Sequence, residues 1–202
     1  MEKGRLYIVS APSGAGKTSL LAAACQTLPQ VKVAISHTTR EMRPGEVAGE
    51  HYYFVDKNTF TAMVENGEFL EHADVFGNFY GTSKQSVDQL LEAGSSVVLE
   101  IDWQGARQVR QIYPQASSIF ILPPSISILE ERLRSRGQDS EKVIARRMSE
   151  AKSEMSHYSE YGYLVINDDM AQATQQLINI FSRPDNYQAP PPEELNKLLE
   201  GE

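Results

Sequence analysis

Residues 11–18, near the N-terminus, are of types that could bind the phosphate groups of a nucleotide. They match G-x-x-x-x-G-K-S/T at every fixed position except the first, where alanine replaces glycine. Backbone N–H groups at the start of a helix hold phosphate oxygens, helped by the helix dipole. Gly14 and Gly16 would let the main chain approach the phosphates, Lys17 would supply charge, and the Thr18 hydroxyl would ligate Mg²⁺. The alternative is an ordinary glycine-rich turn that caps a helix.

A second candidate site contains two arginines, Arg40 and Arg43, in a polar, turn-rich stretch from His37 to Gly49. A guanidinium offers a planar fork that bonds two oxygens at once, so the pair suits the phosphate of a small phosphorylated substrate. A solvated basic turn is the alternative interpretation.

The elements that must position these residues alternate between apolar strands and helices, which predicts an α/β fold with a parallel sheet flanked by helices. Predicted strands cover residues 6–10, 31–36, 51–55, 69–75, 97–101, 118–122 and 163–167. Predicted helices cover residues 18–28, 83–93, 125–136, 140–157 and 172–181, and a further one is capped by Asp56 and ended by Gly67.

These elements predict three regions. Residues 1–35 and 83–182 form a P-loop core that includes a helical lid at about 125–160, where residues 134–139 are basic and broken by glycine. Residues 36–82 form an inserted mixed α/β substrate lobe, and residues 183–202 form an extended, proline-rich tail.

The composition narrows the classes of function. The 202 residues carry a formal net charge of −8, which argues against binding long nucleic acid through its phosphates. Cys25 is the only cysteine, so no intramolecular disulfide can form, and the four histidines lack the spacing of a zinc site. With no membrane span or secretory leader apparent, we expect a cytoplasmic protein. A GTPase should carry an N-K-x-D motif, which is absent, so a small-molecule kinase is favoured.

Further motifs make a resemblance to one family specific. They are Ser-x-Thr-Thr-Arg-x-x-Arg-x-Gly-Glu at 36–46, Tyr52-x-Phe54, Glu71, residues 77–82, residues 101–105, Arg147 and residues 167–169. In this order the sequence resembles guanylate kinases over nearly its whole length, up to about residue 181. Thr82 stands where many relatives would have serine, and the hydroxyl is kept.

The resemblance implies an Mg²⁺-dependent enzyme that transfers phosphate from ATP to GMP. The implied GMP-binding residues are Ser36, Arg40, Arg43, Tyr52, Glu71, Tyr80, Thr82 and Asp102, with Glu100 as a second carboxylate nearby. The implied ATP-binding residues are Ser13, Gly14, Ala15, Gly16, Lys17, Thr18 and Asn167, the last near the adenine or ribose. The implied catalytic residues are Lys17, Arg40, Arg136 and Arg147, with Arg132 and Arg146 as weaker lid candidates. Thr18 would ligate Mg²⁺, and Asp102 would reach it through water.

Chemistry supports the base-reading assignment. Guanine presents N1–H and an amino group as donors beside the O6 acceptor, so the Glu71 carboxylate can pair with the donors and a hydroxyl with O6. Without the resemblance, Glu71 reads as a solvated strand carboxylate, Tyr52 and Tyr80 as strand packing, and Asp102 as a helix cap. Two rival functions stay open: a non-catalytic module that keeps the fold, and a related kinase for another phosphorylated nucleoside or sugar. The sequence also leaves open a homo-oligomer.

Overall fold

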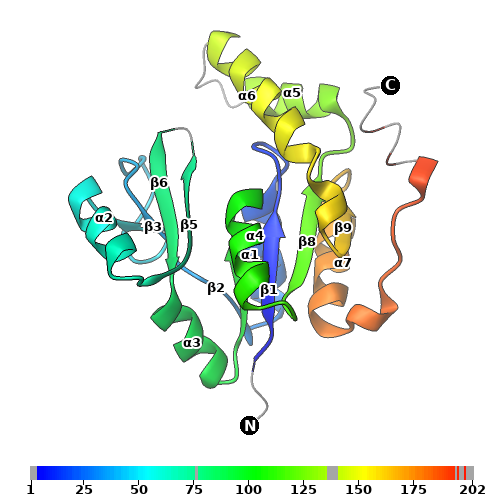
Figure 1. Ribbon diagram of the computed structural model, residues 1–202. Coiled ribbons are helices and arrows are strands. Elements are labelled where there is room, and N and C mark those ends of the chain that lie inside the picture. The colour runs from blue at the N-terminus through cyan, green and yellow to red at the C-terminus, as the bar shows by residue number, and fades with distance from the viewer. Residues whose placement is uncertain (1–3, 76, 136–140, 194, 196–197, 199–202) are drawn as a thin grey trace. The chain divides into compact units, whose positions relative to one another are not determined.

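The computed structural model describes residues 4–75, 77–135, 141–193, 195 and 198. The chain divides into two compact units, one of residues 1–8 and 30–116 and the other of residues 9–29 and 117–202. Strand β1 (Leu6–Ser10) therefore contributes to both units. Figure 1 labels the helices and strands along the chain.

The main sheet has five strands in the order β2-β7-β1-β8-β9. Besides β1, they are β2 (Val31–Val33), β7 (Ser96–Glu100), β8 (Ser117–Leu122) and β9 (Tyr163–Ile166). β2 pairs with β7, and β8 with β9, in parallel. All five residues of β1 and five of the six in β8 are buried, as expected of parallel strands covered on both faces. The predicted α/β fold with a parallel sheet is confirmed.

The first unit also contains a four-stranded sheet in the order β4-β3-β6-β5. Its strands are β3 (His37–Thr38), β4 (Tyr53–Phe54), β5 (Phe69–Val75) and β6 (Asn78–Ser83). Helix α2 (Lys57–Glu65) lies beside this sheet (Figure 1), because Phe60 stacks on the rings of Phe69 and Phe79 at centroid distances of 4.6 and 5.6 Å. As predicted, Asp56 caps α2 by accepting the Thr59 N–H at 2.9 Å.

Two further helices, α3 (Lys84–Glu92) and α4 (Trp103–Ile112), belong to the first unit. The sequence pattern predicts α3 but not α4. Gly105 lowers the intrinsic helix preference of the α4 segment, whereas burial of Ala106 and Val109 favours it through packing. Tertiary contacts therefore decide that α4 forms.

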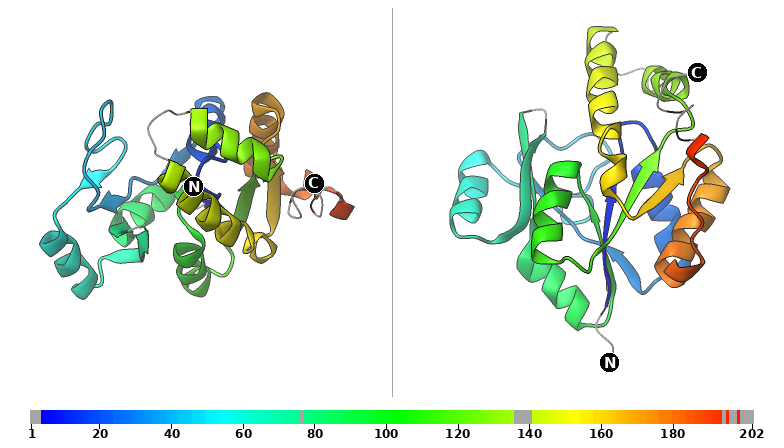
Figure 2. Two further views of the ribbon diagram at one scale, coloured as in Figure 1. Left: turned by 90° about the horizontal axis from the view of Figure 1, so that it is seen from above. Right: turned by 45° about the vertical axis from the view of Figure 1, so that its right-hand side comes forward.

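The helices of the second unit include α1 (Lys17–Thr27), α5 (Ile126–Ser135), α6 (Glu141–Met155) and α7 (Met170–Ser182). It also has two 3₁₀ turns, η1 (Tyr158–Glu160) and η2 (Pro184–Asn186). α1 packs against α7, and α5 against α6, which the two views of Figure 2 show side by side. After η2, the Tyr187 hydroxyl accepts the Leu164 N–H at 2.7 Å and donates to the Leu164 carbonyl at 3.1 Å, which fixes the chain against β9.

Most predicted boundaries agree with the structure. The strands at 6–10 and 69–75 are confirmed at both ends, and the five helices predicted with both bounds fall within two residues of the observed ones. The predicted strand 31–36 is too long, because β2 ends at Val33 and the chain then passes into the second sheet at His37. The predicted strand 51–55 is reduced to Tyr53–Phe54.

Candidate active site

The candidate phosphate loop lies between the end of β1 and the start of α1. Gly14 and Gly16 have φ angles of 94° and 92°, in the left-handed region that favours glycine, and Gly16 is the N-cap residue of α1. A Cβ at Gly14 would also lie 3.0 Å from Leu129 and 3.1 Å from Leu133, both on α5. Lys17, half-buried, and Thr18, exposed, are the first two residues of α1, so the predicted strand, loop and helix occur in the predicted order.

Side chains from distant parts of the second unit contact this loop. Asn167, which directly follows β9, donates from Nδ2 to the Ala15 carbonyl at 2.7 Å, and Glu154 on α6 accepts the Ser13 N–H at 3.1 Å. Asn167 is only 6% exposed. The cap of α7 is Asp169, which accepts the Gln172 N–H at 2.8 Å. The side chain of Asn167 thus contacts the phosphate loop, while Asp169 caps the helix.

The predicted lid arginines lie in different environments. Arg136 falls outside the described residues, and Arg147 is half-buried on α6. Arg132 donates to the Asn167 carbonyl at 3.0 Å, which places it near the phosphate loop. Arg146 pairs with Glu150 at 3.4 Å on the surface of α6. Arg134, in the predicted flap, instead lies in the last turn of α5 and forms exposed ion pairs with Glu130 and Glu141.

In the first unit, three predicted base-reading residues form one hydrogen-bonded chain. Glu71 and Thr82 lie opposite each other on β5 and β6, and Thr82 Oγ1 donates to Glu71 Oε1 at 2.6 Å. Ser36 Oγ lies 3.0 Å from Thr82 Oγ1. Because Thr82 uses its single proton toward Glu71, Ser36 must donate to Thr82. Glu71 is 3% exposed and Thr82 is fully buried, so the interpretation of Glu71 as a solvated strand carboxylate is wrong.

Gly105, in the first turn of α4, is a site residue to which the sequence analysis gave no role. A Cβ at this position would lie 2.4 Å from Glu71 Oε2, so the absence of a side chain makes room for the carboxylate. Asp102 caps the same helix: Oδ1 accepts the Gly105 N–H at 2.9 Å, and Oδ2 accepts from the Gln104 side chain at 3.0 Å. A glycine early in a helix was the signal that could have pointed to this close approach.

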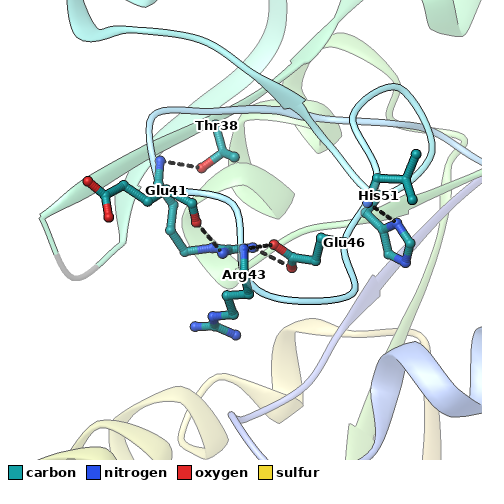
Figure 3. A network of polar contacts seen from close by, with 7 residues as sticks. Thr38, Glu41, Arg43, Glu46 and His51 are labelled. Atoms are coloured by element: carbon teal, nitrogen blue, oxygen red, sulfur yellow. Dashed lines mark hydrogen bonds and ion pairs between the residues drawn. The ribbon is translucent and has the colours of Figure 1, made fainter.

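The two predicted clamp arginines have separate roles in the described structure. Glu46 contacts both: Oε1 pairs with Arg40 Nη2 at 2.7 Å, and Oε2 accepts the Arg43 main-chain N–H at 2.7 Å. Figure 3 labels Glu46 and Arg43 in this network. Arg40 also donates to the Glu41 carbonyl at 2.7 Å. In the same view the Arg43 side chain extends away from this network. Glu46, unassigned by the sequence analysis, thus organises the loop that carries both arginines.

Electrostatics agree with this arrangement. The Arg40 hydrogen bond holds the pKa of Glu46 below its usual range. Burial works against the charge on Arg40, but the hydrogen bonds of Glu46 and Tyr80 and the negative charge of Glu46 outweigh it and raise the Arg40 pKa. Arg40 also lies over the Tyr52 ring, 5.4 Å from its centroid.

Tyr52 and Tyr80 face each other edge-on, with ring centroids 5.9 Å apart. Burial, followed by the negative charge of Glu100, raises the Tyr52 pKa to about 12, so this phenol stays protonated at neutral pH and can donate a hydrogen bond. The contact agrees with strand packing, and it also places both hydroxyl-bearing rings beside Arg40.

Within the described ranges, no group of three or more His, Cys, Asp or Glu residues is arranged to hold a metal ion. Among the same residues, no helix has the length and apolar character needed to cross a membrane.

The parallel α/β sheet, with a glycine-rich loop running from β1 into the first turn of α1, defines the P-loop class of nucleotide-binding proteins. Comparison with known proteins narrows the class. The family model of guanylate kinase matches residues 3–183. The chain therefore belongs to the guanylate kinase family.

Individual relatives agree with this assignment. A guanylate kinase of Pseudomonas fluorescens strain Pf-5 is 57% identical over 196 residues, which cover 97% of this chain and 95% of that protein. A guanylate kinase of Escherichia coli strain K12 is 58% identical over 182 residues, covering 89% and 88% of the two chains. The crystal structure of a guanylate kinase from Anaplasma phagocytophilum superposes with a TM-score of 0.74 at 33% identity, covering 93% and 88%.

Proposed function

We propose that this protein transfers the γ-phosphate of ATP to GMP and produces ADP and GDP. The observation that carries the proposal is the buried chain from Ser36 through Thr82 to Glu71. The Glu71 carboxylate is held in a fixed position beside two hydroxyls, and guanine N1–H and its amino group are donors with which a carboxylate can pair. Adenine presents an acceptor at N1, so it would leave buried groups unpaired.

For the acceptor phosphate, we propose Arg40, Arg43, Tyr52 and Tyr80 as ligands. The raised Tyr52 pKa favours a neutral donor, and Arg40 lies beside the same ring. The Arg43 side chain points away from the hydrogen-bonded network (Figure 3), and we propose that it contacts the phosphate of GMP. Asp102 is proposed to contact GMP or to hold Mg²⁺ through water, in addition to its described role as the cap of α4.

For the donor, we propose that residues 13–18 bind the phosphates of ATP through main-chain N–H groups and the Lys17 ammonium. Phosphoryl transfer needs little covalent help, because positive groups stabilise the charge on the migrating phosphoryl while water is excluded. Lys17, Arg40, Arg136 and Arg147 are the residues we propose to supply that charge. Asn167 is proposed to support the donor site from its position against the loop.

Mg²⁺ is the proposed cofactor. The described residues offer the exposed Thr18 hydroxyl at the start of α1, and no cluster of three carboxylate, imidazole or thiolate groups. This donor set fits a cation held mainly by phosphate oxygens and water, as Mg²⁺ prefers. When bound, the ion would neutralise phosphate charge, while Thr18 would orient it.

A coupled assay of ADP release tests the function, with GMP, AMP, UMP and dTMP as acceptors and Mg·ATP as donor. The expected result is turnover with GMP at least about 10²-fold above the other acceptors in kcat/KM. No turnover with any of the four, from folded protein that binds GMP, would favour the non-catalytic module. Preference for another acceptor would favour the related kinase.

A further inference from the structure

Asn167 is held in place by groups from three elements of the second unit. Its N–H donates to the Leu122 carbonyl of β8 at 2.8 Å, and its carbonyl accepts from Arg132 of α5 at 3.0 Å. Its side chain is buried and donates to the Ala15 carbonyl in the phosphate loop at 2.7 Å. The side-chain amide is therefore a fixed donor aimed at one carbonyl of the loop.

That hydrogen bond determines the orientation of the peptide that joins Ala15 and Gly16. The peptide is planar and trans, so its carbonyl and its N–H point in opposite directions. With the Ala15 carbonyl held by Asn167, the Gly16 N–H must point away from Asn167. If the peptide were flipped, a carbonyl oxygen would take the place of that donor, and it would repel a phosphate.

The loop itself supplies little resistance to such a flip. Gly16 has a φ of 92°, and glycine visits both signs of φ about equally readily. A Cβ at Gly16 would lie 2.5 Å from Asn167 Nδ2, so the close packing of the amide also requires glycine there. An anchor from outside the loop sequence is the physical means of selecting one orientation.

We propose that Asn167 is a positioning residue that keeps the Ala15–Gly16 peptide in the phosphate-binding orientation. The proposal deepens the proposed function and rests on it, because it assumes that the loop binds the phosphates of ATP. In this role Asn167 strengthens the binding of the ATP phosphates through the loop, whereas a direct contact would strengthen the binding of the adenine or ribose.

The probe that separates these roles is tripolyphosphate, which has the phosphates of ATP and neither adenine nor ribose. Its affinity and that of ATP are measured by calorimetry with Mg²⁺ for the wild type, Asn167→Ala and Asn167→Asp. The aspartate variant keeps the side-chain volume but presents an acceptor to the Ala15 carbonyl. Asn179→Ala is the matched control, since Asn179 is exposed on α7 and its side chain accepts from Gln175 at 3.1 Å. The stoichiometry of GMP binding to each preparation checks the folded fraction, and its GMP affinity checks that the acceptor site is intact.

We expect both Asn167 variants to bind tripolyphosphate and ATP about tenfold more weakly, with GMP affinity unchanged and Asn179→Ala like the wild type. Weaker ATP binding with unchanged tripolyphosphate binding would overturn the proposal in favour of an adenine or ribose contact, and unchanged binding of both would overturn it outright. A folded wild type that binds neither probe would instead overturn the proposed function itself.

Discussion

Replacing Glu71 by glutamine gives a test of base recognition, because the substitution keeps the shape of the side chain. Glu71 is 3% exposed and accepts the Thr82 hydroxyl at 2.6 Å, so its carboxylate is held in one orientation. In the variant, one oxygen can still accept from Thr82. The other position becomes an NH₂ donor and would face the donors of guanine.

The magnitude follows from two losses. A hydrogen bond to a charged group contributes about 1.5–3 kcal/mol, and a buried donor left without an acceptor costs about 1–3 kcal/mol. Together they amount to about 2.5–6 kcal/mol, or roughly two to four powers of ten in kcat/KM for GMP. AMP should lose much less, because the adenine amino group and N1 can pair with an amide.

The assay is ADP release with GMP and with AMP, and the result is the ratio of the two kcat/KM values, which does not depend on the folded fraction. Glu68→Gln is the matched control: Glu68 is exposed and accepts from Asn66 at 3.0 Å. If the ratio for Glu71→Gln stays within about twofold of the wild-type ratio, Glu71 does not recognise the base and is not part of the site.

Three further substitutions test other parts of the site. Lys17→Ala should lower kcat by at least about 10²-fold while calorimetry still detects GMP binding, and normal turnover would contradict the phosphate-loop assignment. Gly105→Ala places a Cβ 2.4 Å from Glu71 Oε2, so the carboxylate must shift and the GMP to AMP ratio should fall about tenfold. An unchanged GMP to AMP ratio in this variant would contradict the prediction, because the Glu71 carboxylate could then move without affecting base recognition. Glu46→Gln should lower the free energy of unfolding by about 1 kcal/mol at pH 7. Arg40 lowers the Glu46 pKa, so the stability difference between wild type and variant should be present at pH values above the ordinary carboxyl pKa and vanish as pH falls through the lowered Glu46 pKa. Denaturant titrations at several pH values measure this difference. A difference that does not change with pH would exclude the Arg40–Glu46 ion pair as its source.

The structure gives supporting roles to three residues to which the sequence alone assigned none. Glu46 bridges Arg40 and the Arg43 main chain, Gly105 makes room for a carboxylate, and Glu154 accepts an N–H of the phosphate loop. The contacts of Gly105 and Glu154 are not implied by spacing along the chain, because each joins residues far apart in sequence that the folded backbone brings together.

Local information in the sequence was sufficient for the sheet type, most element boundaries and the phosphate loop. Apolar runs, turn glycines and the cap at Asp56 act over a few residues, so their physics can be read along the chain. Tertiary structure alone decided that Glu71 is buried, that α4 forms, and that Asn167 contacts the loop 152 residues away in sequence. The reason is that burial and long-range hydrogen bonds depend on which surfaces the fold brings together, and no periodicity along the chain encodes that choice.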